Sequence, residues 1–245
     1  MNAIQFLTRI PVSSHSYKPN SLARAVKFFP VVGFLIGGFA ALLHMLLVPH
    51  LSRLVAALLV LIFLVCITGC LHEDGLADAA DAFGGGWNRE QILLIMRDSR
   101  IGSYGAAALA LSLAARLLLL SSLPLAHVAQ YLIASQVLSR WTTLPLSYYL
   151  APARAQSEEG FDGQGARVAQ LTSGSAFIVG TLFSFAIAAV ALRRGAVIAI
   201  PVAAGVALLS ASYYRHRIGG VTGDCFGATN QLTEIVVYFC GVWNA

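Results

Sequence analysis

The sequence predicts an all-α protein, a polytopic membrane helix bundle with about seven transmembrane helices and a cytoplasmic N-terminus. Three observations predict this fold class. Of the 245 residues, 58% are hydrophobic and only 11% are charged, and the mean hydropathy is +0.74, whereas soluble domains carry about 25% charged residues. Long apolar runs recur along the chain. The basic residues mostly flank these runs, as expected where a hydrocarbon solvent excludes charge.

Seven apolar runs have about the length needed to cross roughly 30 Å of hydrocarbon. The first contains Gly33 and Gly37, whose spacing favours the close approach of a second helix. The fourth is the weakest, because Arg140 and Pro145 interrupt it. The predicted spans are residues 28–48, 51–71, 104–123, 127–150, 174–192, 196–214 and 226–243.

The distribution of Lys and Arg predicts the orientation of the chain. With the N-terminus in the cytoplasm, the cytoplasmic segments hold eleven basic residues and the opposite segments hold three. We expect one membrane domain over residues 1–245. Residues 1–27 read as an amphipathic segment on the membrane surface, because they lack the layout of a signal peptide. Residues 72–103 and 216–228 then both lie on the cytoplasmic side.

The segment "GCLHEDGLADAADAFGGG" at residues 69–86 concentrates negative charge directly after the second span. It holds four of the eleven acidic residues of the chain. On a helix, Asp74, Asp78 and Asp81 fall on one face, within an arc of roughly 60°. Three carboxylates so close repel one another, and a cation with oxygen ligands, such as Mg²⁺, Mn²⁺ or Ca²⁺, would neutralise them. We therefore expect a metal site here rather than a solvated helix end without a ligand.

Two residues beside these aspartates have more open roles. Glu73 points about 100° away from the aspartates on an ideal helix, where it either supports the site or is solvated. His72 is a base, a ligand or an interfacial side chain, and a lone histidine is more often structural.

The segment "RDSRIGSYG" at residues 97–105 offers cations to phosphate oxygens. Arg97 and Arg100 either bind phosphate or anchor the chain at the cytoplasmic interface, and their proximity to the acidic segment favours neither reading over the other. Gly102 and Gly105 allow the backbone to approach a ligand closely.

Four glycines surround Asp224 in "GGVTGDCFGATNQLTEIVVYF", which starts at residue 219. Helix capping alone would explain the aspartate, whereas a binding loop explains both the aspartate and the glycines. We therefore expect Gly223 and Asp224, together with Gly75, to contact substrate. Glu234 lies almost three turns into the last span and is predicted to face the interior of the bundle.

Composition also argues against other classes of protein. There is no basic stripe interleaved with aromatic residues, so no nucleic-acid partner is expected. Cys66, Cys70, Cys225 and Cys240 form no CxxC pair, and we interpret them as packing residues rather than zinc ligands or redox centres.

Together these motifs resemble the cobalamin synthase family, the adenosylcobinamide-GDP ribazoletransferases, over nearly the whole chain. The acidic segment is also distantly similar to the aspartate motif of CDP-alcohol phosphotransferases, but it departs from the full spacing and lacks the Ala-Arg pair. The segments that resemble the family are "FLTRIPV" at 6–12, "FFPVVGFLIG" at 28–37, "HEDGLADAADAFGGG" at 72–86, "IMRDSRIGSYG" at 95–105 and "GGVTGDCFGA" at 219–228.

The resemblance implies a multi-pass enzyme of the bacterial inner membrane that depends on Mg²⁺ and has its active site facing the cytoplasm. Its substrates would be adenosylcobinamide-GDP and α-ribazole or α-ribazole phosphate. The products would be GMP and adenosylcobalamin or its phosphate, formed in a late step of nucleotide-loop assembly. Membrane lipid is a further expected partner, and a homo-oligomer is left open.

In the mechanism that this family implies, a ribazole hydroxyl attacks the cobinamide-side phosphorus in line and GMP leaves. Asp74, Asp78 and Asp81 would hold Mg²⁺ on the pyrophosphate. Arg97 and Arg100 would stabilise the charge on its oxygens. The general base is left open between Asp81, His72 and Glu73, and Asp224 would complete the metal shell or bind a substrate hydroxyl.

Three other classes compete with this interpretation. A cation-coupled transporter would place acids near the bilayer midplane in matching broken helices, which the sequence does not show. A CDP-alcohol phospholipid synthase would share the metal and the membrane but use lipid substrates. A non-catalytic membrane scaffold would not need clustered acids.

Overall fold

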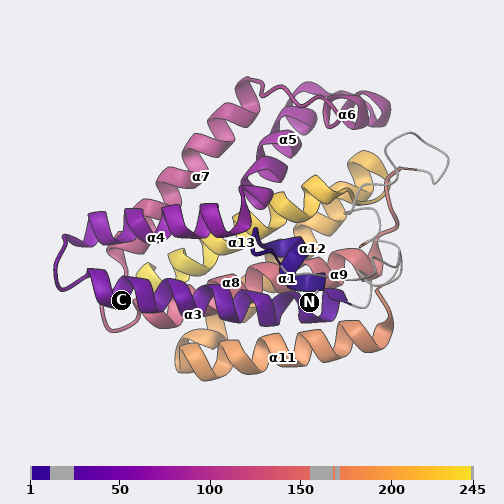
Figure 1. The fold of residues 1–245 in the computed structure, drawn as a ribbon. Helices are drawn as coiled ribbons and strands as arrows, with labels where there is room; N and C mark the ends of the chain where they lie inside the picture. The colour runs from indigo at the N-terminus through magenta and orange to yellow at the C-terminus, as the bar shows by residue number, and fades with distance from the viewer. Residues whose placement is uncertain (1, 12–24, 155–167, 169–171, 244–245) are drawn as a thin grey trace.

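Helices account for the regular structure of the chain, as its composition predicts. The computed structural model describes residues 2–11, 25–154, 168 and 172–243 (Figure 1). Within these ranges the extended pairing is a single bridge between Pro152 and Val221. The helices are α1 (Asn2–Leu7), η1 (Val26–Phe28), α3 (Phe29–Leu47), α4 (Arg53–Thr68), α5 (Leu71–Gly85), α6 (Arg89–Ile95), α7 (Ser103–Ser122), α8 (Val128–Trp141), α9 (Thr143–Tyr149), α11 (Gly174–Leu192), η2 (Arg193–Gly195), α12 (Ala196–Ile218) and α13 (Gly223–Trp243).

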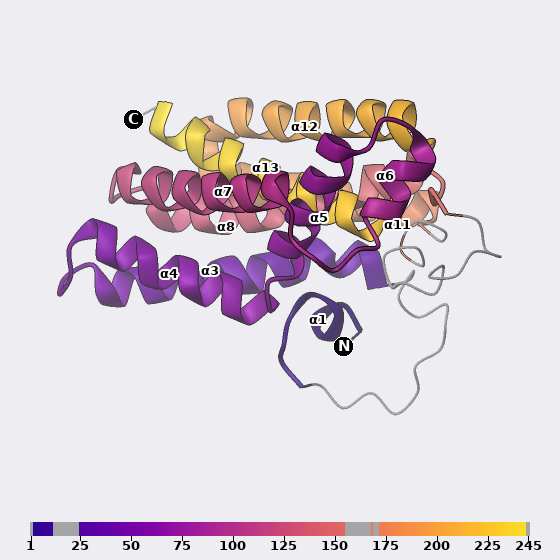
Figure 2. The same cartoon turned by 90° about the horizontal axis from the view of Figure 1, so that it is seen from above.

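The two central helices are α8 and α13. Every side chain from Ala134 to Trp141 in α8 is buried, and α13 buries most of its length. The helices α3, α11 and α13 contact α8, while α5, α7 and α12 contact α13. Seen from above in Figure 2, α12 lies on one side of this pair, and α3 and α4 lie on the other. The core is therefore a layer of two buried helices inside a shell of outer ones.

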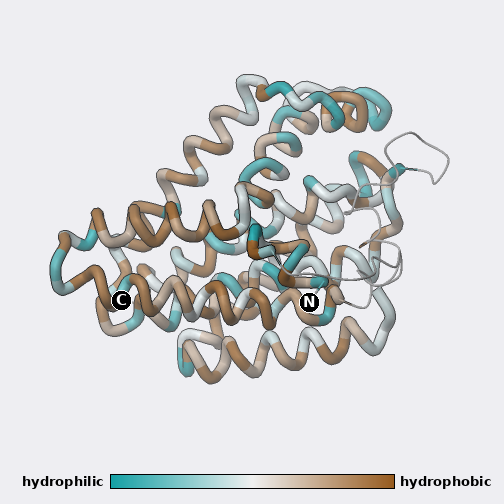
Figure 3. Tube along the Cα trace, in the orientation of Figure 1, coloured by the Kyte–Doolittle hydropathy of each residue, from teal (hydrophilic) through white to brown (hydrophobic). Residues whose placement is uncertain are grey.

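The outer helices are rich in hydrophobic residues (Figure 3). Phe39, Leu111, Leu182 and Val190, for example, are between 61% and 80% exposed. Such a continuous apolar exterior is unstable in water but is the surface that lipid tails require. The chain is therefore a membrane protein.

Among the described residues, three helical stretches are long and apolar enough to cross a membrane, by length and composition: Val26–Leu47, Ser103–Ser122 and Gly174–Ile218. The last comprises α11, η2 and α12. The pair α4 and α5, bent by 85°, is a fourth stretch if it forms one broken span. The count of seven spans and the cytoplasmic N-terminus stay predictions. Of the expected amphipathic segment 1–27, residues 2–11 and 25–27 are described, and they include α1. The rest of the segment lies outside the described residues.

The predicted span 174–192 coincides with α11. The predicted span 127–150 was wrong in being drawn as one continuous helix. It is divided into α8 and α9 at Thr142. Pro145 explains the break, because it has no N–H to donate and its ring crowds the carbonyl four residues earlier, that of Trp141. The predicted loop 216–228 is also shorter than expected, since α12 extends to Ile218 and α13 begins at Gly223.

The glycines of α3 allow α8 to approach closely, as their spacing predicts. A Cβ at Gly33 would overlap the backbone oxygen of Gln136, and one at Gly37 would lie 2.7 Å from the Cα of Ile133. Backbones that meet this closely gain van der Waals contact, which is the main attraction between helices in lipid.

Gly33→Ala is expected to destabilise the protein by about 1–3 kcal/mol, because the added methyl group forces α3 away from α8. Gly38→Ala is the matched control, since a Cβ there meets nothing within 4 Å. That control should be neutral or stabilising by up to about 1 kcal/mol, from helix propensity. Unfolding in detergent micelles measures both variants. Equal stabilities would contradict the close contact.

The corner between α4 and α5 positions the acidic helix. Gly69 (φ +63°) and Cys70 (φ +62°) both adopt the left-handed conformation, which ends α4 and turns the chain. Arg9 lies where a Cβ of Gly69 would project, and its guanidinium donates to the Gly69 carbonyl at 3.4 Å. Gly69 is therefore the C-cap of α4. As a result α5 leaves the direction of α4 and lies along α13.

Candidate active site

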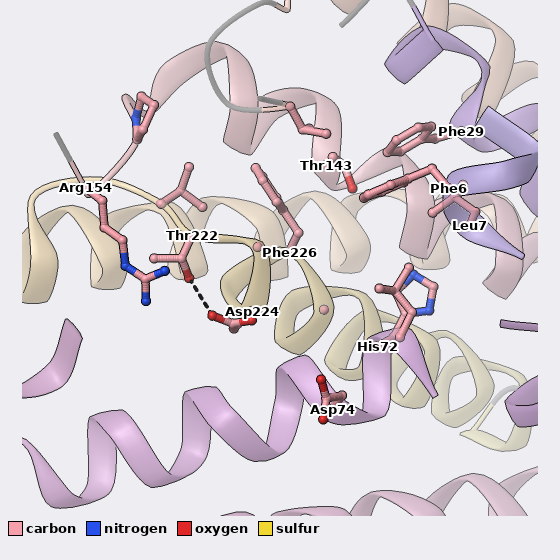
Figure 4. Close-up of a pocket in the computed structure, with 16 residues that line it drawn as sticks. Phe6, Leu7, Phe29, His72, Asp74, Thr143, Arg154, Thr222, Asp224 and Phe226 are labelled. Carbon is pink, nitrogen blue, oxygen red and sulfur yellow. Dashed lines mark hydrogen bonds between the residues drawn. The ribbon is translucent and has the colours of Figure 1, made fainter. Parts of the chain in front are cut away.

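A pocket of about 340 Å³ opens where the N-terminal ends of α5 and α13 meet α1 and the segment after α9 (Figure 4). One part of its lining is polar and the other is apolar. The polar or charged residues are His72, Asp74, Thr143, Arg154, Thr222 and Asp224. The apolar side chains are Phe6, Leu7, Phe29, Leu71, Pro152, Val168, Val221 and Phe226.

Two glycines bring α5 and α13 into contact at this pocket. A Cβ at Gly75 would lie 3.1 Å from the Cα of Asp224, and a Cβ at Gly227 would lie 3.1 Å from the Cα of Gly75. The close crossing places Asp74 and Asp224 on the same pocket wall. Gly75, predicted to contact substrate, is buried at this helix crossing, while Gly223 does line the pocket.

Thr222, rather than Asp224, caps α13. Its hydroxyl accepts a hydrogen bond from the Cys225 N–H at 3.4 Å, as an N-cap side chain does. The same hydroxyl lies 3.4 Å from Oδ2 of Asp224. Burial raises the pKa of Asp224, and the nearby charge of Arg154 opposes this rise. The Asp224 carboxylate is therefore not needed to cap the helix and faces the pocket.

Asp74 and Asp78, the first two aspartates of α5, are close enough to Asp224 for their charges to interact. Asp74 is exposed and lines the pocket, and Asp78 is half-buried one turn later. Burial, together with the nearby carboxylates of Asp224, Asp74 and Asp81, raises the pKa of Asp78 to about 6. Such repulsion marks a place where added positive charge would be stabilising.

Asp81, the third predicted metal ligand, is oriented toward α7. Its Oδ2 accepts from the Gly102 N–H at 2.7 Å and its Oδ1 accepts from the Gly105 N–H at 2.8 Å. A Cβ at either glycine would collide with this carboxylate. Gly102 and Gly105 therefore allow the backbone to approach the carboxylate of Asp81 closely. A carboxylate is well placed there, since it binds the unsatisfied N–H groups that begin α7.

In the described part of the chain, no group of three His, Cys, Asp or Glu side chains converges to hold a metal ion. The predicted triad of Asp74, Asp78 and Asp81 is therefore not preassembled, because Asp81 is held by α7. Mg²⁺, however, is commonly bound by one or two carboxylates together with substrate phosphates and water. One or two of the carboxylates of Asp74, Asp78 and Asp224 would leave the other coordination positions of such an ion to substrate and water.

His72 is buried, only 7% exposed, yet it lines the pocket. Burial lowers its pKa well below the usual 6.5, and the charges of Arg140 and Arg116 add to the effect. The imidazole is therefore neutral at physiological pH, and it can accept a proton or a hydrogen bond.

Glu73 is buried in an ionic network, which excludes the solvated position that the sequence left open. Its Oε1 accepts from Arg116 at 2.7 Å and from the Gln231 amide at 3.2 Å. Arg116 also donates to Glu234 at 3.2 Å, and Tyr238 donates to the same Glu234 oxygen at 3.1 Å. Glu234 is 2% exposed, which confirms its predicted interior position. The network joins α5 and α7 to α13 beneath the pocket.

The pocket cation is one that the motifs did not indicate. Arg154 lines the pocket, whereas Arg97 and Arg100 are not among its described lining residues. Arg100 is instead paired with its neighbour Asp98, with Nε 2.9 Å from Oδ1, and its side chain is 87% exposed. Arg97 and Arg100 as phosphate ligands stay a prediction.

Backbone pairing holds Arg154 in place. The Ala153 N–H donates to the Val221 carbonyl at 2.9 Å, and the Val221 N–H donates to the Ala151 carbonyl at 2.9 Å. This bridge fixes the segment after α9 against the turn before α13, so Arg154 and Asp224 line one cavity (Figure 4). The sequence contains no local signal for this pairing, because the partners are some seventy residues apart.

Comparisons with known proteins identify the family of the chain. The family model described as cobalamin-5-phosphate synthase matches residues 1–242. The chain is 42% identical to an adenosylcobinamide-GDP ribazoletransferase of Rhizobium johnstonii, over 95% of this chain and 92% of that protein. It is 41% identical to a protein of the same name from Azorhizobium caulinodans (95% and 90% covered) and 34% identical to one from Pseudoalteromonas atlantica (96% and 87%). No solved structure matches the chain.

Proposed function

Because the chain belongs to the cobalamin-5-phosphate synthase family, we propose that it is an adenosylcobinamide-GDP ribazoletransferase of the late steps of cobalamin assembly. It joins adenosylcobinamide-GDP to α-ribazole or α-ribazole phosphate and releases GMP. The observation that supports this role best is the pocket in which Asp74, Asp224 and Arg154 lie together at the crossing of α5 and α13.

The reaction is an in-line displacement at phosphorus. A ribazole hydroxyl oxygen forms a bond to the cobinamide-side phosphorus, and the bond from that phosphorus to the bridging oxygen of the pyrophosphate breaks. The bridging oxygen leaves with GMP, and the hydroxyl proton passes to a base. The protein's main tasks in such a transfer are positioning and charge stabilisation.

Asp74, Asp78 and Asp224 are the residues that would hold Mg²⁺. Two belong to the triad predicted from the sequence, and Asp224 takes the place of Asp81, whose oxygens bind the start of α7. When bound, the ion would supply positive charge to the pyrophosphate oxygens and the leaving group. Arg154 adds a guanidinium on the same cavity, suited to phosphate oxygens.

His72 is the preferred general base among the three candidates from the sequence. It lines the pocket and its lowered pKa keeps it neutral. By contrast, the Glu73 carboxylate accepts a hydrogen bond from Arg116, and the Asp81 carboxylate accepts from backbone N–H groups at the start of α7. A hydroxyl within reach of the imidazole would give up its proton as the new bond to phosphorus forms.

We place the enzyme in the bacterial inner membrane with this pocket open to the cytoplasm. The bias of basic residues along the chain supports this orientation. The exposed apolar side chains of the outer helices would contact membrane lipid.

A direct assay tests the proposal. The purified protein in detergent or liposomes, given adenosylcobinamide-GDP, α-ribazole and Mg²⁺, should release GMP in equal amount to the adenosylcobalamin formed. Chelation of divalent cations should stop GMP release, and added Mg²⁺ should restore it. Absence of product from a folded, lipid-reconstituted protein would contradict the function. Full activity in the presence of a chelator would contradict the metal alone.

A further inference from the structure

The apolar end of the pocket is built around three aromatic rings. Phe6 and Phe29 stack with centroids 5.4 Å apart and ring planes 15° from parallel. Phe226 enters from α13 and lies in Figure 4 between Thr222 and Thr143, with Phe6 and Phe29 on the side away from Arg154. Arg154 lies at the opposite end of this view, and Asp224 and Asp74 lie below the rings. One cavity therefore offers an aromatic surface and a charged surface to the same ligand.

The aromatic end is fixed in position before any ligand binds. Phe6 belongs to α1, and the chain directly after this helix is tied to the α4–α5 corner. The Arg9 N–H donates to the Ile67 carbonyl at 2.8 Å, and the Arg9 side chain donates to the Gly69 carbonyl. Phe29 begins α3, and its side chain is 1% exposed. Rings held in this way lose little conformational entropy when a flat group packs against them.

The size of the pocket restricts which substrate can enter. Its volume of about 340 Å³ lies at the lower end of the roughly 300–1,000 Å³ common for small-molecule sites. It has room for one nucleoside-sized group. The corrinoid part of adenosylcobinamide-GDP is several times larger and must stay outside. The candidates are therefore the two nucleosides of the reaction, ribazole and the guanosine of GDP.

The chemistry of the rings separates these two candidates. The base of ribazole is a dimethylbenzimidazole, two fused rings with methyl groups and no exocyclic amino or carbonyl group. Guanine carries an amino group, a carbonyl and a ring N–H, each of which needs a partner when buried. Among the described residues at the aromatic end, the polar side chains that Figure 4 labels are the Thr143 hydroxyl and the His72 imidazole, which are fewer than the polar groups of guanine. The lining suits the apolar base.

We propose that Phe6 and Phe226, supported by the buried Phe29 that stacks on Phe6, form the binding subsite for the benzimidazole base of ribazole. The ribose then extends toward Asp74, Arg154 and Asp224, where its hydroxyl meets the pyrophosphate of the second substrate. This inference rests on the proposed function. It makes the aromatic rings specificity determinants, since they select the lower base that is incorporated.

Steady-state kinetics with the two substrates varied separately test the subsite. Phe6→Leu and Phe226→Leu should each raise the KM for α-ribazole about tenfold and leave that for adenosylcobinamide-GDP within about twofold. Phe39→Leu is the matched control, because Phe39 is 61% exposed on the outer face of α3. It should leave both KM values unchanged.

Other outcomes separate the subsite from the proposed function. If the variants raise the KM for adenosylcobinamide-GDP instead, or neither KM, the subsite is overturned while the function stands. If the wild-type protein makes no product, the function itself fails. Phe6 is only partly buried, so Phe6→Leu should fold even if Phe226→Leu does not. Calorimetric binding of α-ribazole alone should also weaken in Phe6→Leu, and unchanged binding would overturn the subsite without any turnover.

Discussion

Asp78→Asn is expected to lower turnover on the order of 10³-fold and, at the same time, to stabilise the protein in the absence of divalent cations. Both effects have one cause. Burial, together with the repulsive field of Asp224, Asp74 and Asp81, raises the pKa of Asp78 to about 6. Removing its charge relieves this repulsion but also removes one of the proposed ligands of the Mg²⁺ ion. For a half-buried carboxyl the gain is on the order of 1 kcal/mol, after allowance for solvent.

The stabilisation should depend on pH in a defined direction. Above pH 6 the wild-type carboxyl is ionised and its repulsion is fully present, so Asp78→Asn is most stabilising there. As the pH falls from about 6 toward 4, the wild-type carboxyl becomes protonated in the folded protein, and the difference in melting temperature should disappear.

Thermal unfolding in EDTA between about pH 5 and 8, a range around the pKa of Asp78, measures the change in stability. GMP release in the presence of Mg²⁺ measures the change in turnover. Glu90→Gln is the control, since the Glu90 side chain is 76% exposed on α6. Wild-type turnover in Asp78→Asn would remove this residue from the site. A lower melting temperature at neutral pH would show that repulsion does not govern the cluster.

Arg116→Leu is expected to destabilise the protein by about 3–5 kcal/mol. Arg116 is 2% exposed and pairs with both Glu73 and Glu234. Together with Arg140, which interacts electrostatically with both carboxylates, these residues balance two positive charges against two negative ones. Leucine would leave one carboxylate without compensation in an interior that solvates charge poorly. This loss is a large part of the total stability of a typical domain.

A second substitution distinguishes charge balance from packing. Arg116→Leu combined with Glu73→Gln restores a neutral interior of one cation and one anion, so it should recover part of the lost stability. Arg194→Leu is the control at an exposed arginine, where a change within about 0.5 kcal/mol is expected. Denaturant unfolding in micelles measures all three. A double variant less stable than Arg116→Leu alone would show that packing and hydrogen bonding dominate.

The sequence predicted best what depends on one helix at a time. Long apolar runs located α3, α7 and α11 closely, and glycine spacing identified the α3 surface that contacts α8. Helical periodicity placed Asp74 and Asp78 one turn apart on the face that meets α13. These features follow from hydrophobicity and helix geometry, which are local properties.

Features that depend on which helices meet were not predictable in the same way. Periodicity placed Asp81 on the face of Asp74 and Asp78, but it could not show that the start of α7 would bind its carboxylate. It placed Glu73 on another face without showing that Arg116, 43 residues away, would meet it there. Arg154 had no motif, since its position comes from a bridge to the turn before α13. An arginine within an apolar run, as at Arg116, was the available signal of a buried partner.

The crossing of α5 and α13 at Gly75 and Gly227 has a consequence for biosynthesis. The acids of α5 leave the ribosome early, but their partner Asp224 and the pocket wall from α13 come from the last helix of the described chain. A growing polypeptide inserted into the bilayer therefore has no complete reaction centre until α13 has been synthesised. Premature termination before residue 223 would yield membrane-embedded fragments with no competence to consume the activated corrinoid.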